Sequence, residues 1–91
     1  MEMSKFKITD KKGIHLTFKN GMTASVQFGY GNHCSNRFKK VYDGEDIESK
    51  SAAFLAWDEN EKDVCEEKGW LSADEVVDEL VKIKNMRSDK Q

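Results

Sequence analysis

The sequence has no proline, only two cysteines and no long apolar run. Two cysteines cannot build the disulfide framework of a small secreted domain. No apolar stretch approaches the roughly 20 residues of a membrane-spanning helix, and residues 1–7 lack the apolar segment of a signal peptide. With 91 residues, the chain is shorter than an average domain of roughly 150 residues. We therefore expect one small domain over residues 1–91, in the cytoplasm and not in a membrane.

Charge is abundant but unevenly distributed along the chain. Charged residues make up 35 % and apolar residues 37 % of the sequence, and the net charge is -2. Residues 1–42 carry eight basic and two acidic residues, whereas residues 43–91 carry seven basic and fifteen acidic ones. This asymmetry indicates either an interaction surface or two halves that neutralise each other in the fold. The net negative charge disfavours direct binding of nucleic acid.

Alternation of apolar and polar residues predicts three antiparallel strands within residues 5–30. A three-residue loop at 19–21 pairs Phe18 with Met22 and leaves every apolar residue on one face, with the loop glycine in the left-handed conformation. A two-residue Asn-Gly turn would instead place Phe18 opposite Thr23. The three-residue loop is therefore the predicted one, and it makes this region a meander.

A fourth strand is predicted at residues 52–57, which are almost continuously apolar, and residues 63–69 suit an irregular edge segment. Ser72 and Glu75 form a capping box that predicts the start of a C-terminal helix. The predicted fold is α+β: an antiparallel sheet of four to five strands packed against one C-terminal helix. The candidate core residues are Phe6, Ile8, Ile14, Leu16, Phe18, Met22, Ala24, Val26, Phe28, Phe54, Leu55, Trp57, Trp70, Leu71, Val76, Val77, Leu80, Val81 and Ile83.

Residues 29–51 lose all periodicity, which is unusual for so long a stretch in a compact domain. Two glycines, short polar side chains, a tyrosine and an arginine in residues 29–37 suit a small anionic, nucleotide-like ligand, with Arg37 on a phosphate and Tyr30 stacked on a base. The alternative is a purely structural role: a β-bulge whose backbone conformation the glycines permit, followed by a turn. We expect residues 38–51 to be a mobile loop and residues 87–91 a frayed tail. The candidate ligand-binding residues are Tyr30, Asn32, His33, Ser35, Asn36 and Arg37.

Metal binding and catalysis are not expected. His33, Cys34 and Cys65 lack the close cysteine pairs of zinc sites, so no metal or other cofactor is predicted. His33 and Cys34 could form a base and a nucleophile only with a third partner that the sequence does not identify. We therefore expect a non-enzymatic protein.

Acidic residues cluster in residues 43–67, which hold ten Asp or Glu and two Lys. Such a cluster can imitate a phosphate backbone and bind a basic protein surface, although a merely solvated face is the alternative. His15 is expected to be a solvated strand residue opposite Lys7. Trp57 and Trp70 are expected in the core, with an exposed anchor as the alternative. The candidate partner-binding residues are Asp43, Glu45, Asp46, Glu48, Asp58, Glu59 and Glu61.

The motif Phe-Gly-Tyr-Gly-Asn-His-Cys at residues 28–34, after an Asn-Gly hairpin, resembles a family of small uncharacterised proteins of bacterial phages and prophages. The runs Ala-Ala-Phe-Leu-Ala-Trp-Asp and Gly-Trp-Leu-Ser are similar as well. His33 stands where the family often has tyrosine. The resemblance implies an accessory phage protein in a bacterial cytoplasm, and by analogy an anti-defence role.

Two functional hypotheses follow. In the first, the 29–37 loop binds and sequesters a nucleotide-like ligand, and a homo-oligomer helps to enclose it because one subunit is thin. In the second, the acidic 43–67 face inhibits a host defence enzyme by binding it, as an anti-CRISPR protein does.

Overall fold

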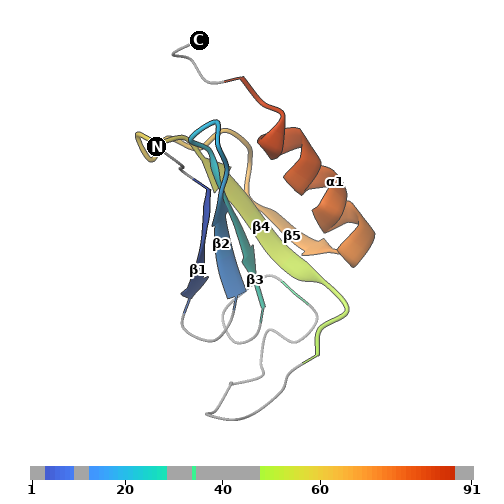
Figure 1. Cartoon of the computed structure of the whole chain (residues 1–91). Helices are drawn as coiled ribbons and strands as arrows, with labels where there is room; N and C mark the ends of the chain where they lie inside the picture. Colours follow the sequence, from blue (N-terminus) through green and yellow to red (C-terminus); the bar gives the residue numbers. More distant parts are fainter. Residues whose placement is uncertain (1–3, 10–12, 29–33, 35–47, 88–91) are drawn as a thin grey trace.

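The computed structural model describes residues 4–9, 13–28, 34 and 48–87. These residues form a five-stranded antiparallel sheet and one helix, which confirms the predicted α+β fold (Figure 1). Each strand pairs with the next one along the chain, so β1 and β5 are the two edges. The elements are β1 (Lys5–Thr9), β2 (Gly13–Thr17), β3 (Thr23–Gln27), β4 (Ala52–Trp57), β5 (Lys68–Leu71) and α1 (Ala73–Lys84).

The predicted three-residue loop between β2 and β3 is present. The Phe18 amide donates to the Met22 carbonyl at 2.9 Å, and the Gly21 amide donates to the Phe18 carbonyl at 3.0 Å. Gly21 has a φ of 87°, in the region that glycine adopts without strain. The resulting register sets Ile14 opposite Val26, and all apolar side chains of the meander lie on one face of the sheet.

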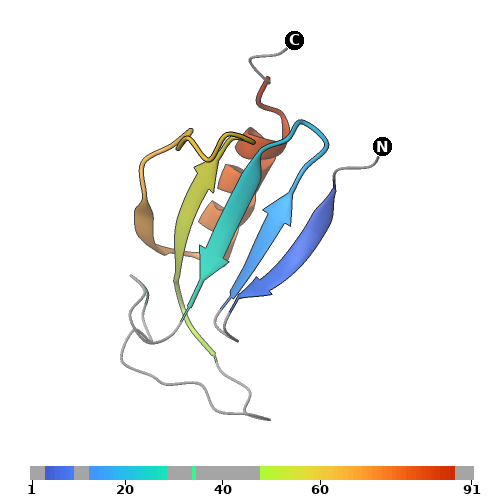
Figure 2. The ribbon, with the colours of Figure 1, turned by 90° about the vertical axis from the view of Figure 1, so that its left-hand side faces the viewer.

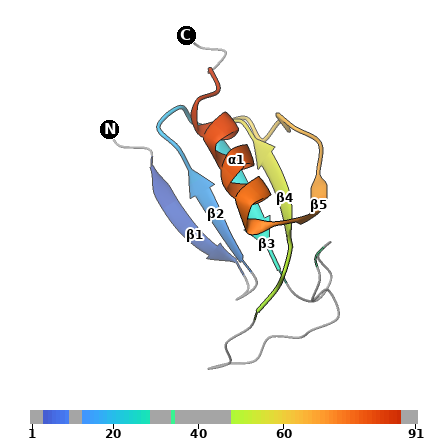
Figure 3. The same ribbon diagram turned by 90° about the vertical axis from the view of Figure 1, so that its right-hand side faces the viewer.

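Helix α1 lies across this apolar face and packs on β3, β4 and β5 (Figure 3). It begins at the predicted capping box, in which the Glu75 amide donates to Ser72 Oγ at 3.2 Å and the Ser72 amide donates to Glu75 Oε1 at 2.9 Å. The opposite face of the sheet carries no helix among the described residues (Figure 2). The domain thus has one covered face and one open face.

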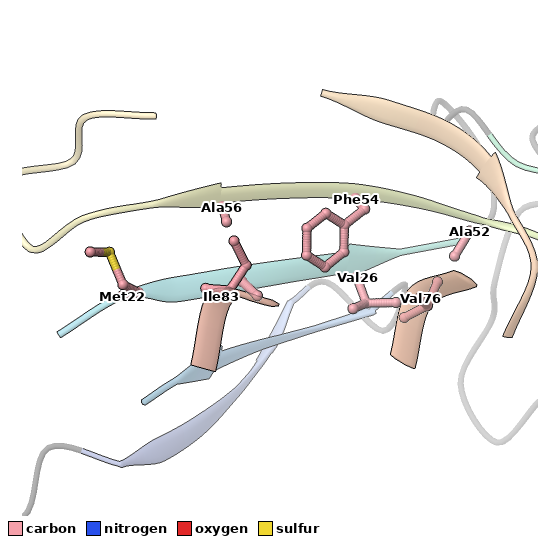
Figure 4. Close-up of a cluster of buried hydrophobic side chains, with 8 residues drawn as sticks. Met22, Val26, Ala52, Phe54, Ala56, Val76 and Ile83 are labelled. Carbon is pink, nitrogen blue, oxygen red and sulfur yellow. The ribbon is translucent and has the colours of Figure 1, made fainter. Parts of the chain in front are cut away.

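The core lies between α1 and the central strands β3 and β4. Phe54 is its largest fully buried side chain, and Ile83 and Val76 of the helix point toward it (Figure 4). Alanines fill the adjacent strand positions, which lets the helix approach the sheet closely. The buried cluster consists of Met22, Ala24, Val26, Ala52, Phe54, Ala56, Val76 and Ile83.

Five predicted core residues are exposed instead: Phe6, Ile8, Trp70, Val77 and Val81. A helix with its side chains is about 10 Å wide, whereas five strands spaced about 4.8 Å apart span roughly twice that width. One helix therefore cannot cover the apolar sides of all five strands. The alternation correctly predicted the direction of the β1 side chains but not whether anything covers them.

Asn20, in the loop between β2 and β3, connects the sheet to the C-terminal end of the helix. Its side-chain Nδ2 donates to the carbonyls of Ile83 at 2.8 Å, Lys84 at 3.2 Å and Met86 at 2.8 Å. Its Oδ1 accepts a hydrogen bond from the Met22 amide at 3.0 Å. One amide side chain thus shapes the loop and donates to carbonyls at the end of the helix, of which that of Ile83 also accepts from the Met86 amide.

Glu79 is a buried charged residue of α1, and no pattern in the sequence predicts its burial. Its Oε1 accepts from Lys68 Nζ at 2.6 Å and its Oε2 from Lys82 Nζ at 3.0 Å. The hydrogen bond from Lys68, and then that from Lys82, hold the pKa of Glu79 below its ordinary value. This ion cluster attaches one flank of the helix to the edge strand β5.

We expect Glu79→Gln to lower the free energy of unfolding at pH 7 by about 1 kcal/mol, the upper range for pairs in contact with solvent. Because the folded pKa of Glu79 is depressed, its stabilisation is complete above the unfolded pKa of about 4.3 and is lost as the pH falls through the folded pKa. Urea unfolding of both proteins between pH 7 and pH 3 checks this. The difference in unfolding free energy between the native chain and Glu79→Gln must shrink toward zero as the pH falls. A difference that stays constant would show that ionised Glu79 does not stabilise the fold.

Candidate functional site

The open face of the sheet carries a shallow hollow of about 430 Å³ at the end where β2 meets the β2–β3 loop and where β4 ends. Basic side chains of β1 line one side, and the acidic turn after β4 lines the other. The lining residues are Lys5, Lys7, His15, Thr17, Gly21, Thr23, Trp57, Asp58, Glu59 and Glu61.

The floor of the hollow includes an aromatic pair formed by His15 of β2 and Trp57 of β4. Their ring centroids are 5.0 Å apart and the rings are nearly perpendicular, at 84°. The rings meet over the intervening strand β3, where His15 pairs with the small, buried Ser25. Such edge-to-face contacts stabilise an aromatic pair beyond the burial of its surface.

Trp57 does not lie where the sequence suggested, and His15 is more buried than expected. His15 does pair with Lys7, as predicted, but it is half-buried rather than solvated. Trp57 is on the open face and not in the core beneath the helix, because its register with Thr23 places it on the polar side of the sheet. Burial, and then the charge of Lys7, lower the pKa of His15. The imidazole is therefore neutral at pH 7 and adds an uncharged ring to the floor.

Hydrogen bonds to Asp58 organise the acidic turn, residues 58–61. Asp58 Oδ1 accepts hydrogen bonds from the Asn60 amide at 2.8 Å and the Lys62 amide at 3.0 Å. The Glu61 amide donates to the Asp58 carbonyl at 2.9 Å, and Glu61 has a φ of 64°, which is uncommon for a residue other than glycine. The Asp58 side chain thus organises the turn by accepting from its backbone amides, whereas the side chains of Glu59 and Glu61 are exposed.

The predicted partner-binding acidic residues that the structure describes do not form one continuous face. Glu48 precedes the first residue of β4, whereas Asp58, Glu59 and Glu61 follow its last residue. A strand of this length spans about 20 Å, so Glu48 is far from the acidic turn. The other predicted acidic residues, Asp43, Glu45 and Asp46, lie outside the described residues.

The predicted ligand loop also falls outside the described residues: Tyr30, Asn32, His33, Ser35, Asn36 and Arg37 are not among them, and neither are residues 38–47 and 88–91. Of the residues considered for chemistry, the structure describes Cys34, which is buried, and Cys65, which is half-buried. Burial raises the pKa of the Cys65 thiol. In the described part of the chain, no group of three or more His, Cys, Asp or Glu side chains is placed to hold a metal ion.

The hydroxyls of Thr17 and Thr23 lie 2.9 Å apart in the hollow and are hydrogen-bonded to each other. The hollow thus combines an aromatic floor with carboxylates on one side and lysines on the other. Such a surface is complementary to a polypeptide that carries charge of both signs.

Sequence analysis did not name Lys5, Lys7, Thr17 and Thr23 as site residues, and it gave Trp57 a binding role only as the alternative to the core. The signal that could have found them is present, since the predicted register already places the first four on the polar face of the meander. Trp57 joins them only once β4 is paired with β3, which the sequence did not specify.

Comparison with known proteins identifies no relative: no family model, curated protein or solved structure matches the chain. Within the described residues, no helix is long and apolar enough to cross a membrane.

Proposed function

We propose that this chain is a non-catalytic protein-binding domain that uses the acidic turn to bind a basic patch of another protein, beside acidic groups of that partner that meet Lys5 and Lys7 across the hollow. The observation that supports this proposal most directly is the turn itself. Glu59 and Glu61 are presented to solvent on a backbone that Asp58 fixes with two side-chain hydrogen bonds. Carboxylates on an already ordered backbone lose less conformational entropy when a partner binds.

The aromatic floor gives the same surface an anchoring element. Aromatic side chains contribute disproportionately to the binding energy of protein interfaces. Trp57 and His15 lie beside the acidic turn in the same hollow. The resemblance to phage proteins suggests that the partner is a host defence enzyme whose basic groove ordinarily binds nucleic acid.

A double charge reversal tests this proposal. The native chain, a Glu59→Lys/Glu61→Lys variant and a Glu66→Lys/Glu67→Lys control are immobilised and exposed to bacterial lysate, and captured proteins are quantified at low and high salt. All four glutamates are exposed, and both variants change the charge by the same amount. We expect one partner to bind the native chain and the control but to bind the turn variant about tenfold more weakly or worse.

High salt should weaken the native interaction, because exposed charges are screened within about 10 Å at 0.1 M. Equal binding by the two charge-reversed variants would contradict the proposal, as would an interaction that is insensitive to salt. Circular dichroism of each variant must first show an intact fold.

A second candidate function is the binding of a small anion by residues 29–37, which stays a prediction. It is favoured by the length of the connection between β3 and β4, which spans the 24 residues 28–51. Neighbouring antiparallel strands need only about 2–5 residues to join them, so the fold does not require this length. An anion-binding loop predicts that Arg37→Ala abolishes binding and that the acidic-turn variant does not.

A further inference from the structure

Strand β1 is an edge strand with a regular backbone. It pairs with β2 in an unbroken register from Lys5 to Thr9, and among the described residues no element lies along its outer side (Figure 3). The other edge strand differs, because the register between β4 and β5 shifts and Trp70 of β5 has a φ of 55°. Irregular edges of this kind disfavour the addition of another strand, whereas a regular edge offers its unpaired N–H and C=O groups.

The hydrogen bonds of the meander establish which backbone groups of β1 point outward. The Phe18 amide donates to the Met22 carbonyl, so these two residues form a hydrogen-bonded pair between β2 and β3. Hydrogen-bonded and non-hydrogen-bonded pairs alternate along an antiparallel ladder, so the backbone groups of Thr17 point the other way, toward β1. Thr17 lies opposite Lys5. Lys5 and every second residue of β1 after it therefore bond to β2.

The intervening residues, Phe6 and Ile8, direct their N–H and C=O groups away from β2. An incoming strand could bond to these groups in two hydrogen-bonded pairs, one at Phe6 and one at Ile8. The two side chains are 75 % and 76 % exposed and lie on the apolar side of the sheet, beside the half-buried Leu16 and Ile14. Residues of the incoming strand opposite Phe6 and Ile8 would share that face, so apolar residues there would cover both side chains.

Lys5 and Lys7 alternate with these residues and lie on the opposite face of the sheet, at the margin of the hollow. Both side chains are exposed, and the described residues of the meander carry three lysines and no carboxylate. Strand β4, whose end leads into the acidic turn, lies three strand spacings away, about 14 Å. The edge along β1 is therefore basic, and it favours acidic residues at the positions of an added strand opposite the two lysines.

The same lysines disfavour a second copy of β1 at this edge. An antiparallel pairing of two β1 strands that sets Phe6 opposite Ile8 also sets Lys7 opposite Lys7, and like charges directly opposite each other destabilise a sheet. Lysines on edge strands commonly protect proteins from self-association in this way. An acidic strand does not meet this repulsion.

We propose that β1 binds an extended segment of a partner protein by strand addition, in which apolar residues opposite Phe6 and Ile8 alternate with acidic residues opposite Lys5 and Lys7. In this binding mode, main-chain hydrogen bonds provide affinity and the alternating side chains provide specificity. The inference rests on the proposed function, because this segment supplies the acidic groups of the partner that meet the two lysines.

A synthetic peptide in which glutamate alternates with valine is the probe, titrated into the native chain and two variants. Lys7→Glu should weaken binding about tenfold or more, because it sets like charges opposite each other. Lys62→Glu is the matched control, since it makes the same change in charge at an exposed lysine after the acidic turn, and it should bind as the native chain does. A peptide of the same composition with glutamates and valines in separate blocks should bind at least about tenfold more weakly.

Substitutions of Phe6 separate the backbone from the side chain. Phe6→Pro removes an N–H group that points outward and no bond to β2, so an edge strand tolerates it. It should weaken peptide binding more than Phe6→Ala, which keeps that N–H. In hydrogen exchange followed by NMR, the peptide should slow exchange of the Phe6 and Ile8 amides, whereas the Lys7 amide, bonded to β2, should be protected already in the free chain.

A chain that does not bind the alternating peptide, or that binds the block peptide equally well, overturns the proposal. Binding that leaves the Phe6 and Ile8 amides unprotected overturns it too, as does self-association of the native chain that protects them. The Glu59→Lys/Glu61→Lys variant should bind the peptide no more weakly than the native chain. A lysate partner that depends on the acidic turn, without peptide binding, would refute strand addition alone. Peptide binding without such a partner would support strand addition and refute the proposed function.

Discussion

Replacing Phe54 with alanine is expected to lower the free energy of unfolding by about 3–5 kcal/mol. Phe54 is 1 % exposed and lies between Val26 of β3 and Lys68 of β5, in one buried cluster with Val76 and Ile83 of the helix (Figure 4). The other β4 residues on this face are alanines, which are too small to fill the cavity left by the ring. The loss therefore includes both the transfer of the ring to water and an unfilled cavity.

This effect is large relative to the total stability. A chain of this size is expected to be stable by about 5–15 kcal/mol, so the substitution removes roughly a fifth of it or more. A loss of 1 kcal/mol lowers the melting temperature of such a domain by roughly 4–8 °C. Thermal unfolding followed by circular dichroism should show a decrease of more than about 12 °C. Phe54→Leu, which leaves a smaller cavity, should be affected less.

Phe6→Ala is the matched control for this prediction. It makes the same chemical change in a strand of the same sheet and on the same face, but at a position that is largely exposed in the monomer. Its effect on the monomer should stay within about 0.5 kcal/mol. Similar losses for both variants would contradict the assignment of the core to β3, β4 and the helix.

Local patterns predicted the elements of this fold well. The register of the meander followed from keeping apolar residues on one face, and the capping box located the start of the helix. Residues 52–57, predicted as a strand, are the observed β4. These features depend on neighbours in sequence or on the period of two that every strand imposes.

Features that depend on the placement of the helix were not predicted. Phe6 and Val77 follow the same apolar patterns as buried residues, and only the width of one helix relative to the sheet explains their exposure. Glu79 is the reverse case, since a glutamate in a helix is ordinarily solvated but here lies between two lysines. The hollow was missed for a similar reason: it joins β1, β2 and the end of β4, and pairing of β4 with β3 was not evident from either strand alone.

Asn20→Asp is expected to destabilise the domain by about 2–3 kcal/mol, more than its size suggests. The substitution keeps the acceptor for the Met22 amide but replaces the Nδ2 group that donates to the carbonyls of Ile83, Lys84 and Met86. Loss of a donor to partly buried carbonyls costs about 1–3 kcal/mol. In addition, the new carboxylate faces the negative end of the helix dipole, which adds about 0.3–1 kcal/mol.

The pH dependence of Asn20→Asp separates these two contributions. Its destabilisation relative to the native chain should shrink at low pH, where the introduced carboxylate is protonated and no longer faces the helix end with a charge. Asn20→Ala removes the donor and also the acceptor for the Met22 amide, so its destabilisation should not depend on a charge at this position. If Asn20→Asp were equally destabilising at pH 7 and at low pH, the charge at the helix end would be unimportant.

Hydrogen exchange tests whether the Asn20 contacts act on the end of the helix. Amides in the last turn of α1 should exchange faster in both variants, while those of β3 and β4 change only with global stability. If neither variant affected the last turn, the loop between β2 and β3 would not hold the helix on the sheet. The buried cluster around Phe54 and the ion pair between Glu79 and Lys68 would then hold α1 on the sheet.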